Sequence, residues 1–303
     1  MTIMTDFQQK MTALLPSVKL LANESMAKHT SFRICGPAEL MAFPRNAEEL
    51  REILKQSALL DRKPAILGAG TNILAPDEGV PGLVICLKDC MDILEQLDAT
   101  RIRVGAGVSM ARAANFAAGC GLSGLEFAHG IPGSIGGGVY MNAGAYGGEI
   151  CQVCQSVEFM DMNGDTRVLP AEEMDFSYRH SRLEAEGGIV LSATFVLTPK
   201  PTDEIRAVMQ DLMARRRASQ PLDLPSAGSA FKRPVGGYAA ALIDQTGLKG
   251  YQVGSASISQ KHAGFAVNLG GATAEDVKKL LKDVSDRVFQ STGIRLEPEV
   301  RIW

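Results

Sequence analysis

A glycine-rich segment between Ser123 and Gly148 constrains this chain more than any other part of its sequence. It holds nine of the chain's 31 glycines, interleaved with apolar residues such as Ile135, Val139 and Tyr140. Glycine costs conformational entropy and packs no side chain, so this density is expected where peptide N–H groups approach a flat or phosphorylated ligand. Flexible linkers are typically polar and lack such apolar residues. The segment therefore predicts a folded ligand-binding loop.

A second glycine turn, Gly68-Ala69-Gly70-Thr71-Asn72, follows the apolar run 65–67. A short strand that ends in such a turn is the arrangement expected of a phosphate-binding loop. It is not the dinucleotide fingerprint of the nicotinamide fold, because it lacks a third glycine and shows no helix-like continuation. From these residues alone, a plain turn explains the segment equally well.

Several segments along the chain occur in an order shared with one enzyme family. They are His29–Ile34, Leu67–Asn72, Gly124–Gly137, Tyr178-Arg179, Ala227–Lys232 and Leu296–Val300. Through them the chain resembles the UDP-N-acetylenolpyruvoylglucosamine reductase family over nearly its whole length. The resemblance implies an α+β protein with an FAD-binding fold of the vanillyl-alcohol-oxidase (PCMH) type in two subdomains, followed by a C-terminal α+β substrate-binding domain. The compact subtype, which lacks the longer substrate-covering insertion of the larger one, is expected, since 247–250 leads within a few residues to Ser257.

The expected domain boundary lies at Pro199 and Pro201, which interrupt regular structure. Residues 1–198 are expected to form the FAD-binding domain, with subdomains of about 1–80 and 81–198. Residues 199–303 are expected to form the substrate-binding domain. Its last strand, about 294–303, is expected to return to the FAD-binding domain.

Local patterns predict several helices and strands. Asn46 is expected to cap a helix through about Leu59, with Glu49 completing a capping box. A short helix of small residues is expected over 109–118, and apolar stripes with helical spacing occur over 205–213 and 277–288. The predicted strands are 65–67, 157–160, 166–169, 189–197 and 264–269.

The resemblance implies a reduction in two steps, in which NADPH reduces bound FAD and the reduced flavin passes a hydride to the enol ether of UDP-N-acetylglucosamine enolpyruvate. Hydride addition leaves negative charge beside a carboxylate, so the site needs a cation, a neighbouring acid and a proton donor. By resemblance, Arg179 stabilises the enolate, Glu299 assists it and Ser229 protonates the carbon. Arg179 and the preceding Tyr178 are expected on a partly buried strand.

The same resemblance assigns the binding residues. FAD is expected to contact Gly68, Ala69, Gly70, Thr71, Asn72, Gly130, Ile131, Pro132, Gly133, Ser134, Gly136, Ala143, Gly144 and Ala145. The substrate is expected to contact Tyr178, Lys232, Arg233 and Arg301. Lys232 is one of the neighbours that could polarise Ser229. Arg233 and Cys35 depart from the family pattern, which usually has asparagine and glycine at these positions.

Charge and composition exclude other classes of protein. A net charge of −3 gives no electrostatic reason to expect nucleic acid as a partner. No apolar stretch approaches the roughly 20 residues that span a bilayer, so a cytoplasmic protein without membrane insertion is expected. No metal is expected, because the cysteines and histidines lack metal-ligand spacing. Cys151 and Cys154 are expected to be reduced, buried thiols, and Arg215–Arg217 either a solvated helix end or a contact to a ligand diphosphate.

Two other functions remain open at this stage. One is a different FAD-dependent oxidase on the same scaffold, which would pass its electrons rapidly to oxygen. The other is a non-catalytic flavin- or nucleotide-binding module, in which Ser229→Ala would change no activity.

Overall fold

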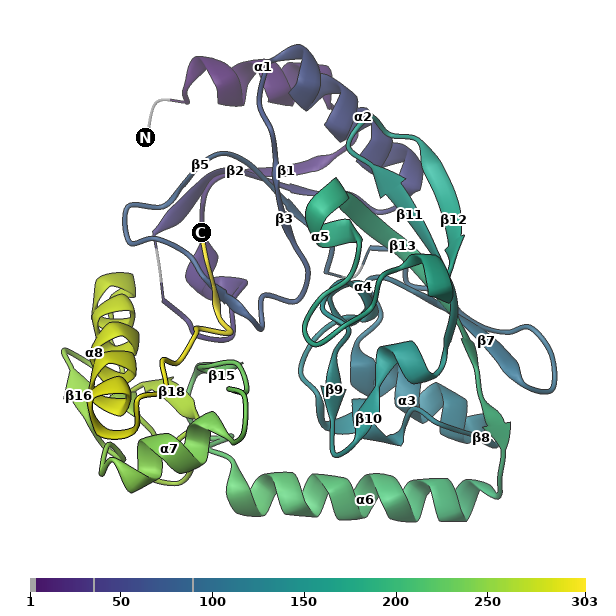
Figure 1. Ribbon diagram of the computed structural model, residues 1–303. Coiled ribbons are helices and arrows are strands. Elements are labelled where there is room, and N and C mark those ends of the chain that lie inside the picture. The colour runs from purple at the N-terminus through teal and green to yellow at the C-terminus, as the bar shows by residue number, and fades with distance from the viewer. Residues whose placement is uncertain (1–3, 35, 89) are drawn as a thin grey trace. The chain divides into compact units, whose positions relative to one another are not determined.

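The computed structural model in Figure 1 describes residues 4–34, 36–88 and 90–303, so the family departure predicted at Cys35 lies outside the described residues. Contacts divide the chain into two compact units. Unit 1 takes the described parts of Met1–Ala22, Leu40–Ala69 and Gly82–Arg215. Unit 2 takes those of Asn23–Glu39, Gly70–Pro81 and Arg216–Trp303.

The first part of the chain forms a four-stranded sheet in the order β1-β2-β5-β3, in which β3 and β5 are parallel. Its elements are α1 (Asp6–Leu14), β1 (Lys19–Ser25), β2 (Pro37–Phe43), α2 (Ala47–Leu59), β3 (Ala65–Leu67) and β5 (Val80–Cys86). The predicted start of α2 is confirmed, because the Asn46 side chain accepts a hydrogen bond from the Glu49 N–H at 2.9 Å. The capping box is not: the Glu49 carboxylate accepts from the backbone N–H and guanidinium of Arg45 instead.

A five-stranded antiparallel sheet in the order β12-β11-β13-β7-β6 forms the centre of unit 1. Its strands are β6 (Leu94–Gln96), β7 (Arg101–Gly105), β11 (Cys154–Asp161), β12 (Thr166–Pro170) and β13 (Gly188–Val196). The strands predicted over 157–160, 166–169 and 189–197 are therefore confirmed. The helix α4 (Ile135–Tyr140) packs against β13 and β7. The helix α3 (Met110–Gly119), which Ser109 caps, packs against α4.

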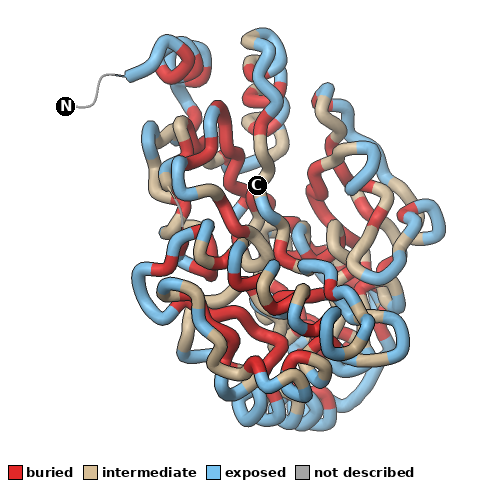
Figure 2. The backbone as a smooth tube through the Cα atoms, turned by 60° about the vertical axis from the view of Figure 1, so that its left-hand side comes forward, coloured by how far each residue is buried: buried red, intermediate tan, exposed pale blue. Residues whose placement is uncertain are grey.

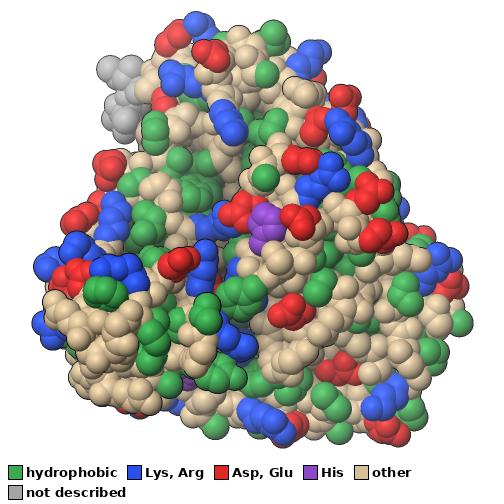
Figure 3. All heavy atoms as spheres, viewed as in Figure 1, with side chains coloured by type: hydrophobic (Ala, Val, Ile, Leu, Met, Phe, Trp, Pro, Cys, Tyr) green, Lys and Arg blue, Asp and Glu red, His purple; other side chains and the backbone are tan. Residues whose placement is uncertain are grey.

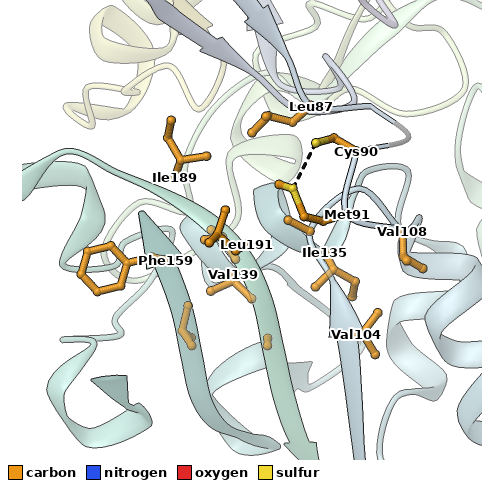
Figure 4. Packing of buried hydrophobic residues seen from close by; sticks show 14 of the residues in the cluster. Leu87, Cys90, Met91, Val104, Val108, Ile135, Val139, Phe159, Ile189 and Leu191 are labelled. Atoms are coloured by element: carbon orange, nitrogen blue, oxygen red, sulfur yellow. Dashed lines mark hydrogen bonds between the residues drawn. The ribbon is translucent and has the colours of Figure 1, made fainter. Parts of the chain in front are cut away.

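The core of unit 1 fills the space between this sheet and the helices. Figure 4 shows Val139 and Ile135 from α4 near Leu191 of β13, with Cys90 and Met91 above them. The Cys90 thiol donates to the Met91 sulfur at 3.0 Å. Figure 2 shows buried and exposed residues alternating along the helices, as expected of amphipathic helices that cover a core.

Unit 2 is built on a second antiparallel sheet, in the order β15-β18-β17-β16. Its elements are β4 (Ile73–Leu74), β15 (Ser226–Ser229), α7 (Ala239–Gln245), β16 (Gln252–Val253), β17 (Ala256–Ile258), β18 (Phe265–Asn268), α8 (Ala274–Thr292) and β19 (Arg301–Ile302). The apolar stripe predicted over 277–288 is the buried face of α8, which packs on β16 and β17. The short path from α7 to β17 is that expected of the compact subtype.

The boundary between the two units defined by contacts falls within a helix. The long helix α6 (Thr202–Ser219) is continuous in Figure 1, and the change of contacts falls within it, between Arg215 and Arg216. The last strand, β19, pairs in parallel with β4, which itself belongs to unit 2. Which domain binds FAD and which binds substrate stays a prediction.

The remaining elements are short and connect these layers. They are η1 (Met26–Lys28), β8 (Leu122–Ser123), η2 (Glu126–Gly130), β9 (Gly144–Ala145), β10 (Gly148–Glu149), η3 (Ile150–Gln152), η4 (Ala171–Glu173), α5 (Leu183–Glu186) and β14 (Thr198–Pro199). Within the described ranges, no helix has the length and apolar character to cross a membrane. On the face shown in Figure 3, acidic and basic side chains are intermingled.

Candidate active site

The turn after β3 needs bare backbone at Gly70. This residue has a φ of +66°, and a Cβ atom there would lie 1.9 Å from the carbonyl oxygen of His29. The Gly70 carbonyl accepts the N–H of Ser31 at 3.0 Å, so the two segments are fixed to each other. Only glycine fits this position, because any side chain would displace the backbone of its neighbour.

Four peptide N–H groups of this turn remain available to a ligand. The N–H groups of Gly68, Ala69, Thr71 and Asn72 donate to no acceptor in residues 4–34, 36–88 and 90–303. All four residues are only partly exposed. A row of peptide donors in a left-handed turn is a favourable environment for phosphate oxygens.

The second glycine loop presents donors of the same kind within unit 1. The N–H groups of Gly133 and Ser134 donate to no acceptor in the described part of the chain. The Ser134 hydroxyl, which accepts the N–H of Gly137 at 3.4 Å, lies 3.1 Å from the place of a Cβ on Gly68. The two loops predicted to bind one cofactor therefore meet at Gly68 and Ser134.

Two glycines of the second segment are required by internal packing. A Cβ on Gly136 would lie 2.9 Å from the Cβ of Ala106, and one on Gly148 would lie 2.5 Å from the ring of Phe127. The Gly136 N–H also donates to the Ala106 carbonyl at 2.9 Å. The density of glycine thus has two causes, where the sequence interpretation gave only the approach to a ligand.

Gly144 and Ala145 form the first strand of a tight hairpin. They pair with Gly148 and Glu149 across a two-residue turn. Both turn residues, Tyr146 and Gly147, have positive φ angles, of +55° and +88°. This is the pattern of a type I′ turn, which matches the twist of the flanking strands. The hairpin gives the predicted FAD-contacting segment a defined backbone.

Arg179 lies at the tip of a tight turn beside this hairpin. Ser177 and His180 exchange both of their backbone hydrogen bonds, each at 3.2 Å. Arg179 has a φ of +57°, and its guanidinium donates to the Gly144 carbonyl at 3.5 Å. The expectation of a partly buried strand is wrong, because Tyr178 and Arg179 form the turn itself and Tyr178 is 44% exposed. The ring of Tyr178 lies 4.9 Å from the Arg179 guanidinium. Unit 1 thus brings a predicted catalytic residue to the predicted flavin segment.

A buried amide links the same two segments. The Asn142 side chain donates to the Ser177 carbonyl at 3.0 Å and to the Glu149 carboxylate at 3.3 Å, and accepts the Cys151 N–H at 3.0 Å. The sequence interpretation missed this residue. The available signal is weak: asparagine tolerates the left-handed region, where Asn142 lies with a φ of +41°.

Unit 2 brings Ser229 and Glu299 to adjacent segments. The Glu299 N–H donates to the Ala230 carbonyl at 3.0 Å, and the Lys232 N–H donates to the Glu297 carbonyl at 2.9 Å. Gly228, with a φ of +78°, allows the irregular register of β15 that leaves Ser229 exposed. The Ser229 hydroxyl is therefore open to a ligand close to the Glu299 segment.

The residues predicted to bind cofactor and substrate also meet at Glu299 in unit 2. The Asn72 amide donates to the Glu299 carbonyl at 3.1 Å, and the Arg301 N–H donates to the Asn72 carbonyl at 3.0 Å. Lys232 forms an exposed ion pair with Glu297 at 3.4 Å. The Arg233 guanidinium lies 4.7 Å from the ring centre of Tyr238.

Cysteine and metal chemistry find little support in the described residues. Burial raises the pKa of the Cys154 thiol to about 12 and also raises the pKa of Cys151 above its ordinary value. Thiols with raised pKa are poor nucleophiles and poor redox centres. In residues 4–34, 36–88 and 90–303, no cluster of three or more potential ligands could hold a metal ion. In the arginine run, Arg215 pairs with Asp211 at 2.8 Å.

The available N–H groups and bare backbone fit a dinucleotide cofactor with a diphosphate, which is the part of FAD that such loops bind. Comparison with known proteins agrees with this geometry. Residues 38–169 match the model of an FAD binding domain. Residues 220–303 match the model described as the UDP-N-acetylenolpyruvoylglucosamine reductase, C-terminal domain.

Similar proteins cover almost the whole chain. A UDP-N-acetylenolpyruvoylglucosamine reductase of Agathobacter rectalis is 45% identical, over 98% of each chain. One of Levilactobacillus brevis is 43% identical, over 95% of this chain and 94% of the relative. The crystal structure of the Thermus caldophilus enzyme has a TM-score of 0.79 at 37% identity, covering 94% of this chain and 98% of that one. These matches confirm the predicted fold class, and the chain belongs to the UDP-N-acetylenolpyruvoylglucosamine reductase family.

Proposed function

We propose that this chain reduces the enolpyruvyl group of UDP-N-acetylglucosamine enolpyruvate to UDP-N-acetylmuramate, with FAD as its cofactor and NADPH as the reductant. Membership of the family makes it an FAD-dependent oxidoreductase of peptidoglycan precursor synthesis. The observation that carries the proposed chemistry is the backbone link between the Ser229 and Glu299 segments, at 3.0 Å between the Glu299 N–H and the Ala230 carbonyl.

The loops supply donors for the cofactor. We expect the N–H groups of Gly68, Ala69, Gly133 and Ser134 in unit 1 to bind the diphosphate of FAD, because they have no acceptor in the described chain. Those of Thr71 and Asn72 in unit 2 are further candidates. Bound FAD supplies the hydride-transfer chemistry that no side chain offers. The hairpin Gly144–Glu149 is the proposed neighbour of the isoalloxazine ring.

The three proposed catalytic residues answer three demands of the substrate. When the vinyl carbon gains a hydride, negative charge spreads over the adjacent carbon and its carboxylate. Arg179 can stabilise this charge with a rigid fork of N–H donors. Glu299 is proposed to assist Arg179 in stabilising the enolate. The exposed Ser229 hydroxyl is proposed to donate the proton to the carbon. Lys232, which forms an exposed ion pair with Glu297, is one proposed neighbour that polarises the Ser229 hydroxyl.

Substrate recognition is proposed to involve four further side chains. Tyr178 and Arg179 stack at the tip of their turn, where an aromatic ring and a cation can receive an anionic sugar nucleotide. Lys232, Arg233 and Arg301 are the proposed partners of the substrate's phosphate and carboxylate groups. Arg233 stacks on Tyr238, which orients its guanidinium. We also propose that the enzyme acts in the cytoplasm, where its nucleotide substrates are made.

The test follows the visible absorbance of bound flavin under anaerobic conditions. NADPH should bleach the flavin, and UDP-N-acetylglucosamine enolpyruvate should restore its colour without oxygen. Ser229→Ala should still be bleached by NADPH but should recover far more slowly with the enolpyruvate compound. Recovery only with oxygen would favour an FAD-dependent oxidase, and a protein that takes up no FAD would contradict the proposal.

A further inference from the structure

Asn142 occupies a position that the proposed mechanism does not use. It immediately precedes the proposed flavin segment 143–145, and its side chain is 1% exposed. All the polar atoms of its amide are engaged, with Ser177, Glu149 and Cys151 as partners at 3.0 to 3.3 Å. A buried amide with satisfied donors and acceptors fixes the segments that it joins, since leaving any of them unpaired is costly.

A contact of Asn142 and a contact of Arg179 close a ring that runs through both residues. Asn142 holds the Ser177 carbonyl at one end of the turn, and Gly144, two residues further along, receives the Arg179 guanidinium on its carbonyl. The chain connects Ser177 to Arg179 on one side and Asn142 to Gly144 on the other. Two of the contacts that place the Arg179 side chain against the flavin segment are therefore known, and one of them involves Asn142 and not Arg179 itself.

The backbone at both ends of this ring adopts an uncommon conformation. Asn142 and Arg179 have φ angles of +41° and +57°, a region that residues other than glycine rarely adopt. Such conformations persist only where surrounding contacts hold them, and they cluster at functional sites. The Arg179 turn contains neither glycine nor asparagine, so contacts from outside the turn must hold it.

Other contacts hold the same turn in place within unit 1. The buried Ser181 hydroxyl donates to the Tyr140 carbonyl at 2.8 Å, and the His180 ring pairs with Glu184 at 3.0 Å. The turn therefore remains attached when the Asn142 contact is lost. Loss of this contact is expected to change the position of Ser177 at the start of the turn, and with it the direction of the Arg179 side chain.

We propose that Asn142 is a positioning residue, which fixes Arg179 against the flavin segment so that its guanidinium meets the developing enolate. The inference rests on the proposed function of Arg179 and extends it to a residue that touches neither substrate nor the reacting atoms. Because Arg179 stabilises charge that develops only as hydride reaches the substrate, loss of Asn142 should slow the second half-reaction and spare the reduction of flavin by NADPH.

Two substitutions distinguish the role of the side-chain amide from that of the left-handed backbone conformation. Asn142→Asp keeps the size and the acceptor but replaces the group that donates to the Ser177 carbonyl and to the Glu149 carboxylate with a second acceptor. Asn142→Gly keeps the left-handed conformation readily accessible and removes the side chain, so it serves if the aspartate variant folds poorly. The matched control is Asn268→Asp in unit 2, a buried amide that donates to the Phe32 carbonyl at 3.1 Å and accepts two N–H groups.

The experiment measures both half-reactions of the FAD-loaded full chain by anaerobic stopped flow. Reduction by NADPH should stay within about twofold of the parent rate, and reoxidation by the enolpyruvate compound should slow by at least about tenfold in both Asn142 variants, because a misplacement of about 1 Å can cost 10²-fold. Asn268→Asp should leave both rates unchanged. In the Arg179→Ala background, Asn142→Asp should cause no further loss, as expected of residues that act as one unit.

A second readout does not depend on turnover. Hydrogen exchange at the Ser177 and His180 amides, measured with and without FAD, should quicken in Asn142→Asp and not in Asn268→Asp. Equal slowing of both half-reactions, additive losses with Arg179→Ala, or unchanged exchange in the turn would each overturn the inference. These outcomes are distinct from failure of the proposed function, which would show as a parent enzyme whose reduced flavin is not reoxidised by the enolpyruvate compound.

Discussion

Replacement of Gly70 by alanine tests whether bare backbone at the first glycine turn is a structural requirement. The φ of +66° costs a residue with a side chain about 1–2 kcal/mol. The new Cβ would lie 1.9 Å from the His29 carbonyl oxygen, an overlap with backbone that cannot be relieved by rotating a side chain. Crowding of this kind typically lowers the free energy of unfolding further, by about 1–3 kcal/mol. Alanine also makes the unfolded chain less flexible, which raises the free energy of unfolding by about 0.4–1 kcal/mol. The expected destabilisation is therefore about 1–5 kcal/mol.

Gly271 provides a matched control in the same unit. Its φ of +77° imposes the same backbone penalty, but no atom lies within 4 Å of an added Cβ. Gly271→Ala should therefore lower the free energy of unfolding by only about 1 kcal/mol, once the lower entropy of the unfolded chain is included. Urea unfolding followed by the fluorescence of Trp303, the only tryptophan of the chain, reports on unit 2. Equal destabilisation by the two substitutions would refute the argument that contact with His29 requires glycine.

Three further predictions address the chemistry and the buried thiols. Ser229→Ala should slow reoxidation by the enolpyruvate compound by about 10²–10⁴-fold while NADPH reduces the flavin at the parent rate, measured in separate half-reactions. Arg179→Lys should slow the same step by about 10²–10³-fold, because an ammonium cannot replace the planar fork; a loss confined to substrate binding would contradict this role. Burial raises the pKa of Cys154 from 9.0 to about 12, so the unfolded thiol ionises first and the free energy of unfolding should decrease as pH rises above 9. Urea unfolding at several pH values should show a shallower decrease in Cys154→Ala.

Local structure followed from local signals in the sequence. The cap at Asn46 and the apolar stripe of α8 were predicted correctly, because each depends on residues within a few positions of one another. The turn at Tyr178 and Arg179 was not, since it has no glycine, proline or asparagine to mark it. Its left-handed Arg179 is held by a distant partner, and local propensity says nothing about such partners.

The pairing of distant strands could not be predicted from the sequence for a related reason. The strand β19 was recognised as a strand-like tail, but its parallel partner β4 lies more than 200 residues earlier and is only two residues long. Hydrophobic alternation indicates which side of a strand is buried and carries no information about the partner strand. The grouping of 23–39 and 70–81 with the C-terminal part of the chain, which depends on such pairings, could not be foreseen.

Glycine density alone does not distinguish a ligand-binding loop from a tightly packed one, and this chain contains both. Gly136 and Gly148 are glycine because Ala106 and Phe127 occupy the space that a side chain would need. At Gly133, by contrast, the N–H has no acceptor in the described residues, so its donor is available to an anion. Alanine at the first kind of position should reduce stability whether or not FAD is bound. At the second kind, alanine keeps the N–H donor but adds a Cβ where an anion would approach the backbone, so the affinity for the cofactor should fall. The two kinds of glycine therefore differ in which state of the enzyme requires them.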